Sequence, residues 1–123
     1  MIKIMIPILQ NFAIRGITFE NRQQIIAELK ENMLLELSPE PENPYDQNAV
    51  AILFEGEKIG YVPREYSAYI SSLLQQGIKL YITVQKIAEK ITPEGKIRIP
   101  IALIYQIADE LEYHQLDPQG GER

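Results

Sequence analysis

A chain of 123 residues, of which 46% are apolar and 24% charged, has the length and composition of one globular domain. The sequence has no cysteine, which excludes disulfides and thiolate metal sites, and no apolar run of the roughly 18 to 20 residues that a membrane-spanning helix needs. The N-terminal segment lacks the pattern of a signal peptide, so we expect a cytoplasmic protein that makes no membrane contact.

The net charge of −5 is concentrated at the C-terminal end. Residues 109–123 hold five acidic residues against Arg123 alone, which leaves 11 basic and 12 acidic residues in positions 1–108. We therefore predict a nearly neutral folded body followed by an acidic, flexible tail over residues 109–123. The alternative is a tail that mimics DNA or contacts a partner protein. A nearly neutral body argues against strong binding of nucleic acid by charge alone.

The N-terminal third predicts strand and then helix. Pro7 places residues 1–11 either at a sheet edge or in an irregular lead-in, and we expect the first firm strand over residues 11–17. Asn21 is a suitable N-cap for the apolar residues at helical spacing that follow, which predicts a short helix over about residues 22–31.

The middle third predicts a strand over residues 33–38, a hairpin over 50–62 and a second helix. This helix begins at Pro63, whose missing N–H costs nothing in a first helical turn, and Gly77 supplies a left-handed stop. The residues that we expect on its buried stripe are Tyr66, Tyr69, Ile70, Leu73 and Leu74.

Two long β segments, residues 78–87 and 96–107, complete the pattern, and Pro100 should mark a bulge or a sheet edge. About six strands with two short inserted helices favour a mainly β fold, a small closed or half-closed β-barrel, over a doubly wound sheet. We expect one domain over residues 12–108, with residues 1–11 as an N-terminal lead-in strand.

The sequence lacks the residues that most kinds of catalytic site need. The only histidine, His114, lies in the acidic tail, and no glycine-rich phosphate loop is present. Glu40, Glu42 and Asp46 share one loop and offer a hard cation three carboxylates, but the intervening prolines hold that loop extended. We predict no enzyme activity, no cofactor and no bound metal; a metal-dependent nuclease is the minor alternative.

The stretches "EPENPYDQNAVAI" and "IGYVPRE" carry the most specific pattern in the chain. Together with the sequence around them, over about Phe12 to Ile107, they resemble a HIRAN domain. The resemblance implies a modified OB-like β-barrel. It also implies a non-catalytic module, found alone or fused to fork-reversal ATPases, that binds single-stranded DNA at its free 3′-hydroxyl end.

By motif position, the resemblance implies three DNA-binding residues. Tyr45 and Asp46 match a tyrosine and an aspartate of the DNA-binding version, in which the aspartate accepts a hydrogen bond from the 3′-hydroxyl. Phe19 matches a base-stacking aromatic. Thr18 stands where that version has an arginine, and near Ile97 it has a further aromatic that this chain lacks.

Nearby cations are candidates to replace the missing arginine. They are Arg15, Arg22, Lys96 and Arg98, provided that they line the same binding groove as the motif residues. Arg64 is a further candidate for a phosphate contact. The expected partners are therefore a single-stranded DNA end and, in DNA repair or fork processing, a helicase or a nuclease.

Each of the three motif residues also has a purely structural interpretation. Asp46 has the side chain to build its own turn, Tyr45 to cap the barrel, and Phe19 to fold onto the first helical turn as a hydrophobic staple. If these interpretations hold, the alternative function is a protein-interaction domain that has lost DNA binding and docks a helicase or nuclease partner.

Overall fold

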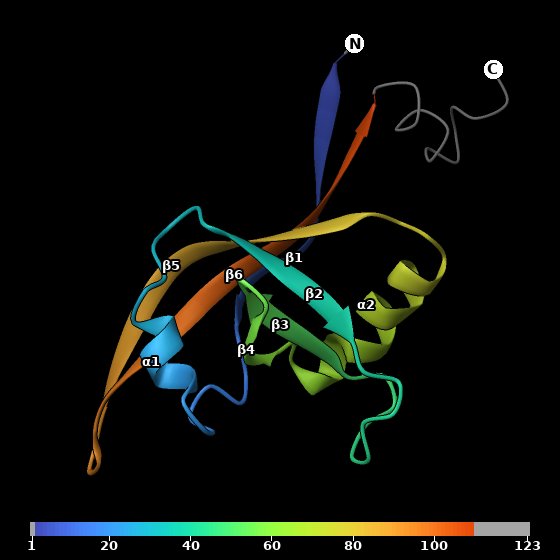
Figure 1. Ribbon diagram of the computed structural model, residues 1–123. Helices are drawn as coiled ribbons and strands as arrows, with labels where there is room; N and C mark the ends of the chain where they lie inside the picture. Colours follow the sequence, from blue (N-terminus) through green and yellow to red (C-terminus); the bar gives the residue numbers. More distant parts are fainter. Residues whose placement is uncertain (1, 110–123) are drawn as a thin grey trace, which may run out of the picture.

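The computed structural model describes residues 2–109, and these form six strands and two helices (Figure 1). In chain order the elements are β1 (Lys3–Ala13), α1 (Arg22–Ile26), β2 (Leu34–Pro39), β3 (Val50–Phe54), β4 (Glu57–Tyr61), α2 (Arg64–Gln75), β5 (Leu80–Thr92) and β6 (Gly95–Asp109). The predicted flexible tail, except Asp109, lies outside the described residues, as does His114. No helix in the described part is long and apolar enough to cross a membrane.

The strands form one antiparallel sheet in the order β1-β6-β5-β2-β3-β4. The mainly β class is therefore confirmed, but the sheet is not closed into a barrel, because β1 and β4 remain its two ends. Within residues 2–109 the two ends meet at one bridge. Just beyond β1, Arg15 and Tyr61 exchange two backbone hydrogen bonds of 2.9 and 2.8 Å.

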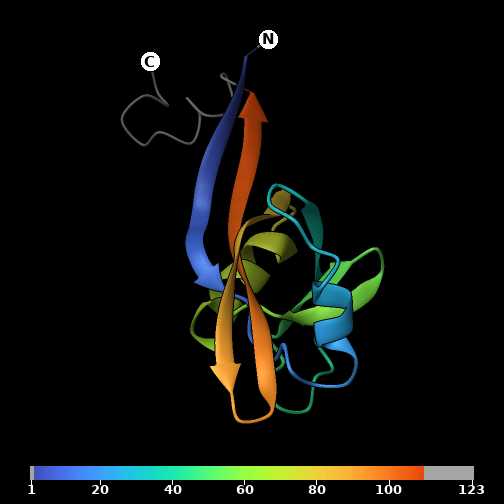
Figure 2. The same ribbon diagram turned by 90° about the vertical axis from the view of Figure 1, so that its left-hand side faces the viewer.

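The N-terminal strand begins earlier than predicted. β1 pairs with β6 from Lys3 to Ala13 instead of starting near residue 11, and Pro7 sits in this edge strand beside a register shift. The outer halves of β1 and β6 leave the body together as a two-stranded arm (Figure 2). After Ala13 the chain leaves β6 and crosses toward β4, which splits the predicted strand over residues 11–17.

Pro100 lies inside β6 and not at a sheet edge. Its carbonyl accepts a hydrogen bond of 3.0 Å from the N–H of Ile14, just past the end of the β1 ladder. The absent N–H faces that same side, so the pairing of Pro100 with Ile87 in β5 is intact. The nearby register shift belongs to β5, between Val84 and Lys86.

The first helix is much shorter than the predicted residues 22–31. α1 ends at Ile26, and the N–H groups of Glu28 and Leu29 bond three residues back, in tighter turns. The chain then pairs with β5, because the N–H of Asn32 donates to the carbonyl of Val84 at 2.7 Å. Asn21 precedes the helix but makes no side-chain capping bond, so its predicted role is wrong.

The second helix starts after Pro63 and is followed by Gly77 at φ 82°, as predicted. Its buried face was predicted correctly for Ile70, and Leu74 packs against the core, but the prediction was wrong for the two tyrosines. Tyr66 and Tyr69 are 40% and 53% exposed, whereas the buried residues are Ser67, Ile70 and Ser71. Small serines let the helix approach the loop that precedes β3, and this approach positions the site described below.

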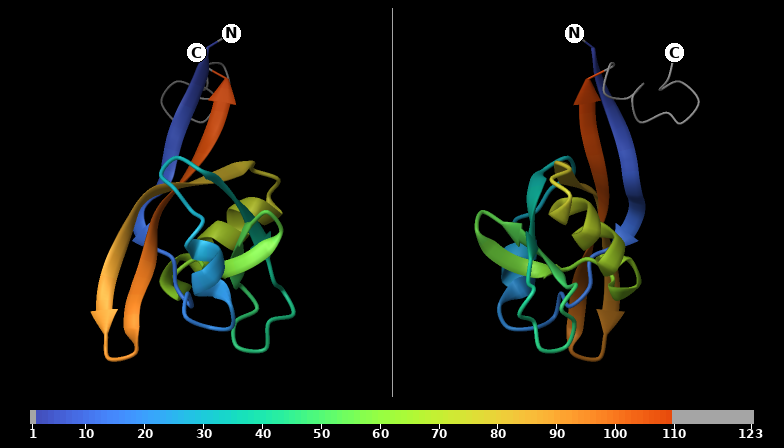
Figure 3. Two further views of the ribbon diagram at one scale, coloured as in Figure 1. Left: turned by 60° about the vertical axis from the view of Figure 1, so that its left-hand side comes forward. Right: turned by 90° about the vertical axis from the view of Figure 1, so that its right-hand side faces the viewer.

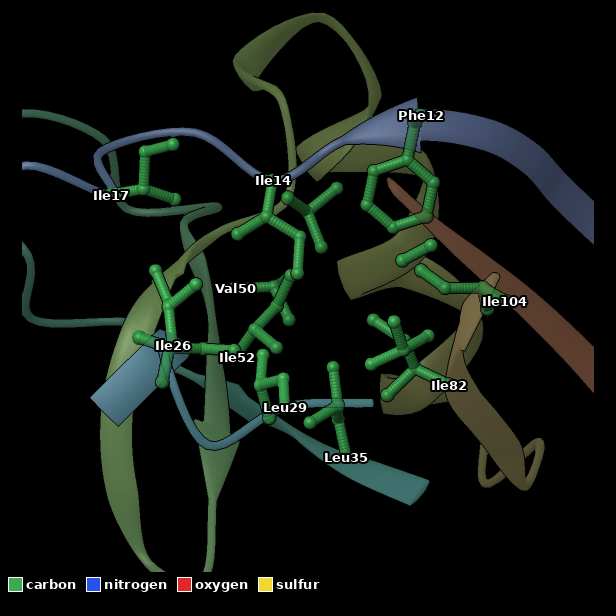
Figure 4. Close-up of a cluster of buried hydrophobic side chains, with 14 of the residues drawn as sticks. Phe12, Ile14, Ile17, Ile26, Leu29, Leu35, Val50, Ile52, Ile82 and Ile104 are labelled. Atoms are coloured by element: carbon green, nitrogen blue, oxygen red, sulfur yellow. The ribbon is translucent and has the colours of Figure 1, made fainter. Parts of the chain in front are cut away.

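The core lies between the curved sheet and the two helices (Figure 4). Its fully buried side chains include Ile14, Ile26, Leu29, Ile52, Ile82 and Ile104. Two loops that connect these elements, residues 14–21 and 40–49, lie at the end of the molecule opposite the arm (Figure 3). The packed core thus fixes the bases of both loops.

Candidate nucleic-acid interface

The proline-rich loop is organised by one asparagine. The Oδ1 atom of Asn43 accepts hydrogen bonds from the N–H groups of Tyr45 and Asp46 at 2.8 and 3.1 Å, while its Nδ2 atom donates to Glu40 at 3.0 Å. An asparagine that bonds the backbone two residues on makes a tight turn. This turn places Tyr45 at the loop surface with 84% of its area exposed, so the tyrosine does not cap the core.

Asp46 has a structural role and also faces the site. One carboxylate oxygen accepts from the N–H of Asn48 at 2.9 Å, and the other accepts from the hydroxyl of Ser67 in α2 at 3.0 Å. An ionised carboxylate has about four acceptor positions, so two hydrogen bonds do not exhaust it. The side chain is therefore fixed in place and still able to accept from a ligand.

The facing loop presents the second aromatic ring. Phe19 is 63% exposed, so the predicted packing onto the first helical turn as a staple is wrong. Its carbonyl accepts from the N–H of Arg22 at 3.1 Å, and the intervening Glu20 has φ 55°. A positive φ is uncommon outside glycine, and here it turns the chain sharply at the loop tip.

Arg22 is a buried arginine next to the rings of Phe19 and Tyr61. The residue is only 8% exposed, and its Nη1 atom donates to the carbonyl of Gly16 at 2.6 Å. Its Nη2 atom lies 3.2 Å from Oε1 of Glu20. The guanidinium carbon is 5.7 and 5.6 Å from the ring centres of Phe19 and Tyr61, within range of a cation–π interaction.

Tyr61 joins the site to a charged network behind it. Its hydroxyl donates to Glu40 at 2.8 Å, and Lys58 reaches the same carboxylate at 2.6 Å and the tyrosine hydroxyl at 2.8 Å. Burial alone would raise the pKa of Glu40, but hydrogen bonds from Lys58, Asn43 and Tyr61 outweigh it and lower that pKa. The bonds to Glu40 and then Tyr61 raise the pKa of Lys58.

These parts enclose a groove of about 610 Å³. Its two walls are the 40–49 loop and the 14–21 loop, and Tyr61 and Val62 connect them. The predicted site residues that line it are Tyr45, Asp46, Phe19, Arg15, Arg22 and Arg64.

Two arginines of the groove are engaged at its rim. Arg64 donates to the carbonyl of Tyr45 at 3.0 Å, and Arg15 lies 3.6 Å from Glu65. Both arginines are exposed on the surface. Their hydrogen-bond fork leaves further N–H donors for a ligand.

Several predicted residues lie elsewhere. Thr18 is exposed but does not line the groove. Arg98 donates to the carbonyl of Ala27 at 2.9 Å on the far side of α1, and Lys96 pairs with Glu89 at 3.5 Å. Neither cation lines the groove.

The carboxylate metal site is not formed within residues 2–109, where no cluster of three potential ligands occurs. Glu40 is committed to Lys58, Tyr61 and Asn43. Sequence reasoning missed the role of Tyr61, which links the groove to that network. The only available signal was its place after Gly60 in "IGYVPRE", and this said nothing of its contacts.

The fold and the groove define a small antiparallel β domain whose loops present aromatic rings, arginines and one fixed carboxylate. Its sequence assigns it further: the chain belongs to the HIRAN domain family, whose model matches residues 9–107. HIRAN domains are in general DNA-binding modules without catalytic activity. No curated protein sequence matches the chain.

Two solved structures share the fold. The crystal structure of a protein from Lactobacillus plantarum matches with a TM-score of 0.65 and 20% identity, covering 85% of this chain and 98% of that chain. The crystal structure of the HIRAN domain of human HLTF matches with a TM-score of 0.64 and 15% identity, covering 95% of this chain and 88% of that chain. At these identities the likeness concerns the fold.

Proposed function

We propose that this HIRAN domain binds single-stranded DNA at a free 3′-hydroxyl end, as a non-catalytic module in DNA repair or fork processing. The observation that carries the proposal is that Tyr45, Asp46 and Phe19 line one groove together with three arginines. Two loops far apart in sequence supply the three motif residues and Arg15, whereas Arg22 and Arg64 are the first residues of α1 and α2.

Each part of the groove suits one part of a strand end. The exposed rings of Tyr45 and Phe19 are surfaces on which bases stack without regard to sequence, at about 1 to 3 kcal/mol per base. The Asp46 carboxylate accepts a hydrogen bond from a 3′-hydroxyl and repels a 3′-phosphate. Arg15 and Arg64 at the rim attract the backbone.

The arginine expected at position 18 has a different source in this proposal. Thr18 lies outside the groove, whereas Arg22, four residues later, lies inside it. In this proposal Arg22 therefore supplies a cation to the groove that position 18 does not. Lys96 and Arg98 take no part.

A protein-interaction role is the second candidate, favoured by the free edge of β1. This strand ends the sheet, and its arm carries Met5 with 56% of its area exposed. An exposed strand edge is a template for pairing with another chain. In this alternative a helicase or nuclease partner docks on the arm, and the groove binds no strand.

The test measures fluorescence anisotropy of a labelled single-stranded oligonucleotide, with a 3′-hydroxyl or a 3′-phosphate, at low and moderate salt. Asp46→Asn is the sharpest variant, because it removes the charge while the amide keeps an oxygen for the N–H of Asn48. Its NH2 group can donate to the Ser67 hydroxyl, which then donates to the carbonyl of Arg64. We expect wild type to prefer the hydroxyl end, and the variant to lose about tenfold of that preference, as for a hydrogen bond to a charged group.

Glu42→Gln is the matched control, because it removes a negative charge from the same loop at an exposed position outside the groove. It should keep the end preference of wild type. If wild type binds neither end at low salt, or if Asp46→Asn and Glu42→Gln behave alike, the end-binding role is wrong and the arm becomes the surface to test.

A further inference from the structure

Arg22, the first residue of α1, is an unusual cation, because it is buried and its charge has a single ionic partner. Among the described residues only Glu20 pairs with it, at 3.2 Å. The Nε atom is buried and has no hydrogen-bond partner in residues 2–109. Buried charges are normally both paired and fully hydrogen-bonded. The Nη1 and Nη2 atoms carry four N–H donors, and the contacts with Gly16 and Glu20 use two of them, so the guanidinium has donors that the fold itself does not use.

Its partner is poorly suited to a permanent role. The side chain of Glu20 is 75% exposed, against 9% for Arg22. An exposed carboxylate regains its hydration on leaving, so little free energy holds it in place. Glu20 is also the residue with φ 55° at the loop tip, and it lines the groove itself.

We propose that Arg22 is a phosphate-binding residue of the groove and that Glu20 occupies its anion site until a phosphodiester of a bound strand displaces it. This inference rests on the proposed function and adds to it a ligand for Arg22 and an exchange step. The guanidinium fork matches two phosphate oxygens as well as it matches a carboxylate. Glu20 is then an internal competitor that weakens strand binding.

The position of the rings supports this assignment. The guanidinium carbon of Arg22 lies 5.7 and 5.6 Å from the ring centres of Phe19 and Tyr61. A base stacked on the exposed ring of Phe19 brings its own backbone phosphate to the same part of the groove. Arg22 is the cation in contact with that ring and lines the same groove.

The first measurement compares oligonucleotide affinity of wild type, Glu20→Gln and Glu65→Gln. Glutamine at position 20 keeps an acceptor for Arg22 and removes the competing charge. Glu65→Gln is the matched control, because it frees Arg15 from a pair in which both side chains are exposed. We expect Glu20→Gln to tighten binding about fivefold at low salt, and Glu65→Gln to change it much less.

The double variant Glu20→Gln/Arg22→Lys tests the coupling. If Glu20 competes only for Arg22, the gain in oligonucleotide affinity from Glu20→Gln is smaller in the Arg22→Lys background than in wild type, because the guanidinium fork is replaced by an ammonium. A gain that persists in full in the double variant contradicts the inference, because it is then a general charge effect.

The second measurement does not depend on DNA. Inorganic phosphate is titrated into ¹⁵N-labelled protein while the Nε–H signal of Arg22 is followed by NMR, assigned by its loss in Arg22→Lys. We expect this signal to shift at lower phosphate concentration in Glu20→Gln than in wild type or Glu65→Gln.

The two measurements separate the two proposals. A shift of the Arg22 signal with phosphate, without oligonucleotide binding by any variant, supports the anion site and overturns the proposed function. Oligonucleotide binding with an Arg22 signal that phosphate leaves unmoved in Glu20→Gln overturns the anion site and keeps the proposed function.

Discussion

Gly60 lies where the segment after β1 crosses β4, and it has no room for a side chain. A Cβ atom at this position would lie 2.4 Å from the carbonyl oxygen of Arg15 and 2.6 Å from the Cγ2 atom of Ile14. The carbonyl oxygen cannot simply retreat, since it accepts the hydrogen bond from the N–H of Tyr61 at 2.8 Å. Gly60→Ala must therefore separate the two ends of the sheet.

The expected loss in the free energy of unfolding follows from the contacts that the added methyl group disrupts. Overpacking of a tight core costs about 1 to 3 kcal/mol, and each of the two bridge hydrogen bonds contributes about 0.5 to 1.5 kcal/mol. Because relief of the clash breaks the same bonds, these contributions overlap, and we expect a loss of about 3 kcal/mol. That is a large part of a typical stability of about 5 to 15 kcal/mol.

Urea unfolding followed by circular dichroism measures this loss. Gly56→Ala is the control: Gly56 has φ 84° in the β3–β4 turn, and nothing lies within 4 Å of its added Cβ, so only backbone strain of about 1 to 2 kcal/mol applies. If Gly60→Ala lowers the free energy of unfolding no more than Gly56→Ala does, the crossing is not tightly packed. It then does not fix the segment at Tyr61 and Val62 that connects the two walls of the groove.

Two further predictions concern the loop and its network. Tyr45→Ala should leave the free energy of unfolding unchanged within about 0.5 kcal/mol, because the ring is exposed, and should weaken oligonucleotide binding by about 1 to 3 kcal/mol; anisotropy and urea unfolding check both, and a large loss of stability contradicts it. The folded pKa of Glu40 is lowered, so its network stabilises the protein above the ordinary carboxyl pKa and this contribution is lost as pH falls through the folded value. The folded pKa of Lys58 is raised, so its contribution holds below the ordinary value and is lost as pH rises through the folded one. Lys58→Met should lower stability at neutral pH and flatten the acid-side decline of the urea midpoint; an equally steep decline contradicts this.

Features determined by a few neighbouring residues were predictable from the sequence. The hairpin turns at Glu55 and Gly56, both at positive φ, and α2 starts after Pro63 for reasons of local geometry. The motif resemblance correctly indicated the family. It also brought Tyr45 and Asp46 forward as candidates, although their role in binding stays a prediction.

Features that depend on distant parts of the chain were not predictable. α1 is cut short because β5 captures Asn32 through Val84, a contact that no local pattern encodes. Tyr66 has the spacing of a core residue, yet the helix turns Ser67 inward to reach Asp46. The sequence offered Arg22 and Arg98 equally as candidate cations, but only Arg22 lines the groove. The difference depends on how the chain crosses after β1, which the local sequence does not show.

In the function proposed above, the pairing of the groove arginines limits the affinity that this nearly neutral domain gains from its contacts with a strand. Arg15 pairs with Glu65, Arg22 with Glu20, and Arg64 donates to a backbone carbonyl, so every arginine that lines the groove already has an acceptor. A strand must then exchange its phosphates for these acceptors, which lowers the net gain per contact and suppresses non-specific binding to DNA. In the proposed function, selectivity for an end therefore depends on the 3′-hydroxyl bound to Asp46, whose carboxylate keeps free acceptor positions beside its bonds to Asn48 and Ser67.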